Sequence, residues 1–170
     1  MNIFVTSPCP EESAIVLPDS HINKMPTETC QMLAHVASRH YNNYGTLPKI
    51  NGDPYKTENI AQRKHPCTIW ATKSIHNATW LLYHGLMICE EFERRFGHSH
   101  GTYKTLLAAF DIFPEGNLNE TTDFIRAMDD NLKNDNSIDT FTAYKLYINS
   151  KSWVSSDYKK IPSRKPIWVN

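Results

Sequence analysis

Hydrophobic positions along the chain recur with the spacing of an α-helix over two long stretches. In the first stretch, five apolar residues fall on one arc at 100° per residue, namely Ile22, Met25, Met32, Leu33 and Val36. Asp19 or Ser20 is suited to cap this helix, which we predict to continue to about His40. Pro26 lies inside the stretch and predicts either a kink or a fresh first turn.

The second helical stretch begins at Pro66 and ends at Gly97, a residue suited to the left-handed position after a helix. Ser74 is a candidate N-cap at which this helix would restart. Residues 42–64 are polar and rich in Gly, Pro and Asn, so we predict a long loop between the two stretches. Shorter helices are predicted at about residues 102–110 and 137–147.

The two ends of the chain are predicted to be extended. The short apolar run Asn2–Val5 would be an edge strand or a buried extended segment. The tail, residues 159–170, contains Pro162 and Pro166 and is expected to be extended as well. The sequence therefore predicts a mainly α fold: a single-domain helical bundle over residues 1–170, with a short extended N-terminal segment and an extended C-terminal tail.

Charge limits the classes of function. Eighteen basic residues balance eighteen acidic ones, whereas a duplex-binding protein usually carries a basic excess because contacts to phosphate supply much of its affinity. The charge is nevertheless uneven along the chain. Residues 111–139 hold eight acidic and two basic residues, and residues 140–170 hold six basic residues and one aspartate. This basic tail would lie near an anionic substrate, or it is solvated surface that balances the acidic stretch.

The remaining composition predicts a cytoplasmic protein with reduced thiols. Four cysteines are scattered without a Cys-x-x-Cys pair or zinc-finger spacing. The first residues lack the basic region and apolar run of a signal peptide. Nowhere do eighteen apolar residues run together, so we expect no spanning helix and no membrane partner.

Polar side chains line the first helix directly beside its apolar arc. His21, Lys24, Glu28, Gln31 and His35 fall within about 80° of one another at helical spacing. A lysine and a glutamate one turn apart tune each other's proton affinity, and histidine is the usual acid or base near neutral pH. The stripe would therefore line a cleft, or it is exposed surface with a Glu–Lys pair. A kink at the intervening proline would rotate His21 and Lys24 relative to Glu28.

A second group of candidate residues belongs to the second helical stretch and comprises His65, Trp70, Ser74, Asn77, Trp80 and His84. The two tryptophans would stack on a base in a nucleotide or single-strand site, although tryptophans at helical spacing are more typical of a core. His65 stands at a helix entry, where its imidazole would bind a phosphate or cap the helix.

No motif indicates a metal or a cofactor. The pair His98-x-His100 has a spacing suited to a strand, and no Glu-x-x-His or His-Asp motif accompanies it. The six glycines do not cluster into a phosphate-binding loop, and serine-hydrolase motifs are absent. We therefore predict neither a metal site nor a cofactor.

The chain resembles a family of small phage-encoded proteins, most of them uncharacterised, over nearly its whole length. The resemblance rests on Asn2-Ile3-Phe4-Val5, His21-x-x-Lys24-Met25, Glu28, Gln31-Met32-Leu33, His65-Pro66-Cys67-x-Ile69-Trp70, Trp80, Glu90, Arg95-Phe96-Gly97, Ala127-Met128, Ala143-Tyr144, Tyr147, Lys151 and Arg164-x-Pro166-x-Trp168. Pro26 departs from the aliphatic residue expected there, and Asp129 from the expected proline. The resemblance implies a viral accessory protein in the host cell cytoplasm that acts on nucleotides or DNA.

In outline the chain is also similar to the pyrimidine-dimer glycosylases, small helical proteins that end in aromatic and basic residues. Those enzymes attack with the amine of an exposed N-terminal residue. Here Asn2 follows Met1, and methionine removal favours a small second residue, so we expect the amine of residue 2 to be blocked. Lys24 would then have to supply the amine from a desolvated position.

Our leading hypothesis is an enzyme that processes a nucleotide or a nucleic-acid base. Its catalytic cluster would be His21, Lys24, Glu28 and His65, and its ligand-binding residues Gln31, Trp70, Ser74, Asn77 and Trp80. Lys24 would hold a phosphate or act as nucleophile, and Glu28 would transfer protons. The alternatives are a non-enzymatic effector that binds a host protein or sequesters a signalling nucleotide, and a base-excising DNA glycosylase. An enzyme should place Glu28 and a histidine in a concave pocket, whereas a protein binder should expose an apolar patch.

Overall fold

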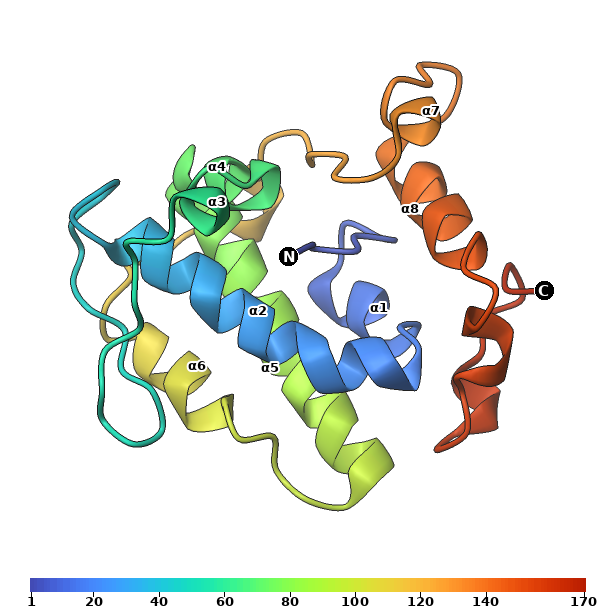
Figure 1. Cartoon of the computed structure of the whole chain (residues 1–170), viewed down its shortest axis with the longest axis horizontal. Coiled ribbons are helices and arrows are strands. Elements are labelled where there is room, and N and C mark those ends of the chain that lie inside the picture. The colour runs from blue at the N-terminus through green and yellow to red at the C-terminus, as the bar shows by residue number, and fades with distance from the viewer.

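The computed structural model describes residues 1–170 and consists of helices joined by loops (Figure 1). The α-helices are α1 (Pro10–Ile15), α2 (Asp19–Ala37), α3 (Ile60–Arg63), α4 (Pro66–Thr72), α5 (Ile75–Phe96), α6 (Tyr103–Ala109), α7 (Asp130–Lys133) and α8 (Thr140–Asn149); the 3-10 helices are η1 (Leu118–Glu120), η2 (Val154–Ser156) and η3 (Pro162–Arg164). The only β pairing is an isolated bridge between two loop prolines, so the predicted mainly α fold is confirmed. None of the helices has both the length and the apolar character that crossing a membrane requires.

The two longest helices, α2 and α5, pack against each other, as the sequence predicts. α1 and α6 also lie along α5, and α4 contacts both long helices. Met25 and Leu33 of α2 and Trp80 and Ile88 of α5 are among the fully buried side chains of the core. The N-terminus lies between α2 and the side of the molecule that carries α8 (Figure 1).

Local interactions end the helices of the second stretch where the sequence predicts. Gly97 follows α5 with a φ of +77°, a left-handed conformation that glycine adopts without strain. The Ser74 hydroxyl accepts a hydrogen bond from the backbone N–H of His76 at 3.1 Å and thus starts α5 separately from α4. The C-terminal tail follows an irregular path that includes one 3-10 turn, η3.

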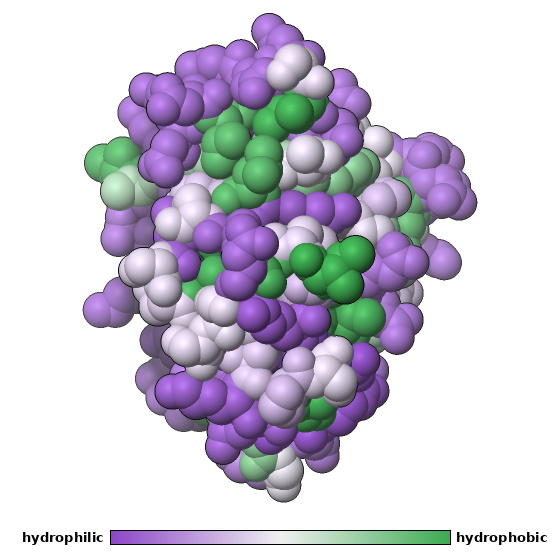
Figure 2. Space-filling view, turned by 90° about the vertical axis from the view of Figure 1, so that its right-hand side faces the viewer, coloured by the Kyte–Doolittle hydropathy of each residue, from purple (hydrophilic) through white to green (hydrophobic).

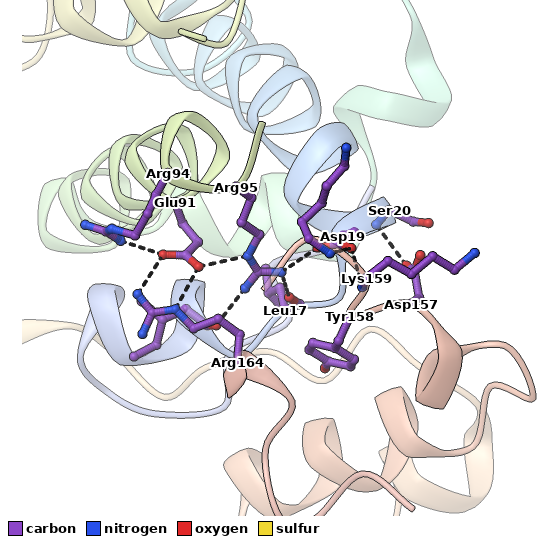
Figure 3. Close-up of polar contacts among 12 residues, drawn as sticks. Leu17, Asp19, Ser20, Glu91, Arg94, Arg95, Asp157, Tyr158, Lys159 and Arg164 are labelled. Carbon is purple, nitrogen blue, oxygen red and sulfur yellow. Dashed lines mark hydrogen bonds and ion pairs between the residues drawn. The ribbon is translucent and has the colours of Figure 1, made fainter. Parts of the chain in front are cut away.

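A buried carboxylate on α5 binds distant parts of the chain (Figure 3). The side chain of Glu91 is fully buried, and both of its oxygens accept hydrogen bonds from arginines. Arg95 Nε lies 2.8 Å from Oε1, and Arg164 of the tail donates to the two oxygens at 2.9 and 3.2 Å. Burial acts to raise the pKa of Glu91, but the hydrogen bonds from Arg95, Arg94 and Arg164 outweigh it and hold the pKa below its ordinary value.

Arg95 extends this network from α5 to the start of α2. Its guanidinium donates to the carbonyl oxygens of Ile15 and Leu17 at 2.8 Å each and lies 3.1 Å from Asp19 Oδ1. Asp19 Oδ2 accepts hydrogen bonds from the backbone N–H groups of residues 159–160. The end of α1, the start of α2 and the C-terminal tail are therefore fixed to one point on α5.

Removing the charge of Glu91 should destabilise the fold far more than removing an exposed carboxylate. Glu91→Gln removes one of the two counter-charges of the buried Arg95 guanidinium and leaves only Asp19, so we expect the free energy of unfolding to fall by about 3 kcal/mol. Urea denaturation followed by circular dichroism measures this loss. Glu58→Gln is the matched control, because its pair with Arg39 is exposed and should contribute at most about 1 kcal/mol. Equal losses in the two variants would contradict the structural role of Glu91.

Candidate functional site

The predicted stripe on α2 brings Lys24 and Glu28 together. The helix runs without a break through Pro26, and Lys24 Nζ lies 3.0 Å from Glu28 Oε1. The lysine side chain is 66% exposed, whereas that of Glu28 is only 12% exposed. The proline therefore does not separate the two charges, as a kink at that position would have done.

The N-terminal amine lies on the other side of the same carboxylate. The Met1 nitrogen is 3.6 Å from Glu28 Oε2, so the glutamate bridges the α-amine and Lys24. From the sequence we expected the amine of residue 2 to be blocked and Lys24 to replace it. The structure places two amines against Glu28, so the amine of Met1 is a second candidate beside the predicted Lys24.

Asn2 holds the first residues in place with its carboxamide, which is almost fully buried. Its Oδ1 accepts hydrogen bonds from the backbone N–H groups of Ile3 at 2.7 Å and Phe4 at 3.2 Å. Its Nδ2 donates to the carbonyl oxygen of Ala127 at 2.8 Å. Phe4 has a φ of +41°, a conformation that residues with a side chain rarely adopt. The N-terminal segment is thus a tight, buried turn rather than an edge strand.

His21 packs as an aromatic ring between two others. It stacks on Phe4 with ring centroids 4.2 Å apart, and Trp153 meets it edge-on at 5.4 Å. Burial, together with the charge of Lys24, lowers the pKa of His21 to about 4 against the weaker opposing effects of Asp157 and Glu28. The lowered pKa favours the neutral imidazole near pH 7, and the catalytic role of His21 stays a prediction.

His65 caps α4, as one of its two predicted roles required. Its Nδ1 accepts a hydrogen bond from the backbone N–H of Cys67 at 3.2 Å, which leaves the proton of the neutral ring on Nε2. Burial and the positive N-terminal amine lower the pKa of His65, and the charge of Glu28 opposes them. His65 is therefore close enough to the amine and to Glu28 for their charges to act on it.

The C-terminal part of the stripe is buried structure. His35 is fully buried, with Nε2 3.5 Å from the side-chain oxygen of Gln62. Gln31 is half-buried and makes no side-chain hydrogen bond, so no contact supports its predicted role in ligand binding.

The ligand-binding residues predicted in the second helical stretch belong to the interior or to a cap. Trp70 and Trp80 are at most 1% exposed and pack edge to face, so neither offers a ring to a base without repacking. Asn77 is fully buried and donates to the carbonyl oxygen of Trp70 and to the hydroxyl of Thr122, both at 2.8 Å. Ser74 caps α5. The predicted stacking wall on Trp70 or Trp80 is thus corrected to core packing.

The surface around Glu28 is not a deep pocket. None of the five main hollows of the surface is lined by Glu28; one of about 280 Å³ lies elsewhere, beside Tyr83 and Phe110. None of these five hollows therefore holds Glu28 together with a histidine, as we expected of an enzyme. No three histidine, cysteine or acidic side chains are arranged to hold a metal ion. The site consists of the Met1 amine paired with the Glu28 carboxylate, next to the exposed Lys24.

An amine paired with a buried carboxylate on an all-α scaffold defines a site suited to nucleophilic chemistry by nitrogen. Residues 1–104 match the sequence profile of the family described as pyrimidine dimer DNA glycosylase, and the chain belongs to this family. Neither a curated protein nor a solved structure matches the chain. The match supports this family and carries no sign of the phage-specific group that the chain resembles.

The matched segment ends within α6 and contains the whole charged cluster: the amine, His21, Lys24, Glu28 and His65. Residues outside the match nevertheless touch this cluster. Trp153 contacts His21, and the Ala127 carbonyl binds Asn2. The site is therefore built from both parts of the chain.

The buried histidine of the cluster should make the protein less stable in mild acid. In the unfolded chain His21 takes up a proton below its ordinary pKa of 6.5, whereas in the folded chain its pKa is lowered to about 4. Between these values the free energy of unfolding should fall, by up to about 1.4 kcal/mol per pH unit from this group. His21→Phe keeps the ring stack and should remove this component.

Urea denaturation of both proteins from pH 4 to pH 8.5 provides the comparison. The difference between the two stability curves should be constant above about pH 7.5, and toward acid the wild type should lose more stability than His21→Phe. Curves that stay parallel through the acid range would show that the folded protein protonates His21 as readily as the unfolded chain does.

Proposed function

We propose that the protein is a DNA glycosylase that excises damaged pyrimidine bases, with the N-terminal amine as nucleophile and Glu28 as its proton acceptor. The observation that carries the proposal is the 3.6 Å approach of the Met1 nitrogen to a carboxylate that is almost fully buried. Membership of the glycosylase family supports the same reaction and a DNA substrate. The proposal therefore takes up the base-excising DNA glycosylase that the sequence analysis gave as an alternative. It replaces the leading hypothesis of an enzyme that processes a nucleotide or a nucleic-acid base.

The α-amine is a better nucleophile here than the lysine beside it. Only the neutral form of an amine has a lone pair for attack, and in water α-amines give up their proton more readily than lysine side chains do. Lys24 is mostly exposed, so it lacks the desolvation that would activate it. We assign it instead to contact with a DNA phosphate, while its ion pair holds one oxygen of Glu28 and leaves the other for the amine.

The proposed reaction proceeds through an imine. Glu28 accepts a proton from the protonated amine, and the lone pair that this frees attacks C1′ of the deoxyribose. The bond between C1′ and the base breaks, and its electron pair leaves with the base, which takes a proton from water. The hydroxide that remains removes a second proton from nitrogen. The bond between C1′ and the ring oxygen then breaks as the nitrogen lone pair forms the C=N bond, and the ring oxygen takes up the proton that Glu28 holds, which gives a protonated imine and restores the carboxylate.

A DNA-binding surface would come from the segment beyond the family match. Its lysines at positions 145, 151, 159, 160 and 165 form no ion pair. Lys151 lies over the Tyr147 ring at 4.0 Å, and Trp153 is 41% exposed beside His21. Figure 2 faces this side of the molecule, where hydrophilic residues surround separate apolar patches. Local lysines and an exposed ring suit a nucleic-acid strand, despite the neutral total charge.

Borohydride reduction tests the nucleophile directly, because it converts an imine into a stable covalent bond. Incubation with a duplex that contains a cyclobutane pyrimidine dimer should give a protein–DNA adduct, located by mass spectrometry on the N-terminal residue. Glu28→Gln should slow adduct formation by about 10²–10⁴-fold, since proton transfer is lost at nearly constant shape. Lys24→Ala should weaken DNA binding but still form the adduct at the same position.

Two controls accompany this test. An uncleaved extension in front of Met1 should abolish the adduct, because it converts the amine into an amide, and Glu58→Gln should react like the wild type. An adduct on Lys24 would replace the proposed nucleophile. Absence of any adduct with the wild type, on dimers and on other damaged pyrimidines, would overturn the glycosylase assignment and favour a non-enzymatic effector.

The exposed tryptophan beside His21 should contribute to DNA binding. Trp153→Ala is expected to raise the Kd for a duplex containing an abasic-site analogue about tenfold, because stacking on one base is lost, whereas Trp153→Phe should retain most of the affinity. Fluorescence anisotropy at fixed salt measures the Kd. Phe110→Ala is the matched control, since Phe110 is an equally exposed ring elsewhere on the surface. Equal affinities of all four proteins would remove Trp153 from the DNA interface.

A further inference from the structure

We propose that Asn2 is the positioning residue of the nucleophile: its carboxamide holds the first turn of the chain so that the N-terminal amine stays against Glu28. This inference rests on the proposed function and extends it to a residue that does not itself touch the substrate. It follows from three hydrogen bonds and from the shape of the turn that they enclose.

An N-terminal amine needs contacts that hold it in place, because it lies at a chain end that is attached to the protein on one side only. Chain ends fray unless contacts tie them down, and a nucleophile gains rate only when its position is fixed. The Asn2 oxygen accepts from two successive backbone N–H groups, at 2.7 and 3.2 Å. These bonds stabilise the left-handed Phe4, whose ring is in turn covered by His21. The turn directs the first residue back toward α2.

The second half of the carboxamide connects the turn to the segment beyond the family match. Asn2 Nδ2 donates to the Ala127 carbonyl, and the Ala127 N–H donates to the Tyr144 hydroxyl at 3.2 Å. That hydroxyl donates to the carbonyl oxygen of Ile125 at 2.9 Å, and Tyr144 itself is fully buried on α8. The amine is therefore braced from a rigid, buried side chain rather than from a loop alone. An aspartate at position 2 would keep the accepting oxygen but lose the donor to Ala127.

The test compares Asn2→Leu and Asn2→Asp with the wild type. Leucine is chosen because a large second residue keeps Met1, whereas alanine would permit its removal and shift the amine by one residue. Asn2→Leu should lower the rate of borohydride-trapped adduct formation at saturating DNA by about 10²-fold, with a small effect on the half-saturating DNA concentration. Asn2→Asp should fall between the two. Asn42→Leu is the matched control: it removes a carboxamide that donates to the Val36 carbonyl, and it should leave the rate unchanged.

A second measurement needs no DNA. The rate at which an acylating reagent modifies the Met1 amine, relative to exposed Lys73 in the same sample, should rise about two- to fivefold in Asn2→Leu as the contact with Glu28 is lost. Unchanged labelling together with an unchanged adduct rate would overturn the positioning role. If labelling rises but the wild type forms no adduct, the positioning role stands and the glycosylase assignment fails. A slower adduct rate with unchanged labelling would show that Asn2 acts elsewhere, and would also overturn the inference.

Discussion

The buried carboxylate of Glu91 is the contact on which the arrangement of the chain depends. A charge without access to water costs several kcal/mol unless hydrogen bonds replace its hydration, and here three arginines supply them. Two of these arginines follow on the same helix, but Arg164 comes from 73 residues further along the chain. The hydrogen bonds of the carboxylate are complete only when the C-terminal tail is packed against α5. The burial of Glu91 and the position of the tail are therefore coupled.

This network also determines where the candidate site begins. Arg95 binds the carbonyl groups that end α1 and the aspartate that opens α2. The first turn of α2 is thereby fixed, and with it the rows of side chains that present His21, Lys24 and Glu28 on one side. Since a helix is rigid over this length, fixing its first residue, Asp19, also fixes the backbone position of Glu28 about two and a half turns later. The ion pairs around Glu91 and the ion pair between Glu28 and the amine are thus linked through a single helix.

Sequence reasoning succeeds here wherever the controlling interaction is local. The helical stretches, the cap at Ser74 and the left-handed Gly97 depend on residues within a few positions and were predicted. So was the meeting of Lys24 with Glu28, one turn apart. The core position of Trp70 and Trp80 was the interpretation that their helical spacing favoured over a stacking site. Two features depend on distant contacts and could not be predicted: the lowered pKa of His21 and the amine beside Glu28. The sequence held one indication of the amine beside Glu28, namely the apolar run that follows Asn2. Burial of this run in the core brings the first residue against α2.

An N-terminal nucleophile makes different demands on a fold from those of a side-chain nucleophile. A lysine within a helix is fixed by the chain on both sides of it. An α-amine is fixed only by the residues that follow it, here residues 2–4. In this protein the charge that would activate the amine comes from Glu28, within the family-matched segment, but the brace behind the amine is the Ala127 carbonyl, beyond it. Trp153, which covers His21 and through it Phe4, also lies beyond the match. If the amine is the nucleophile, the C-terminal third of the chain is therefore part of the working site, because without it the charged cluster of the first 104 residues would lack a fixed attacking atom.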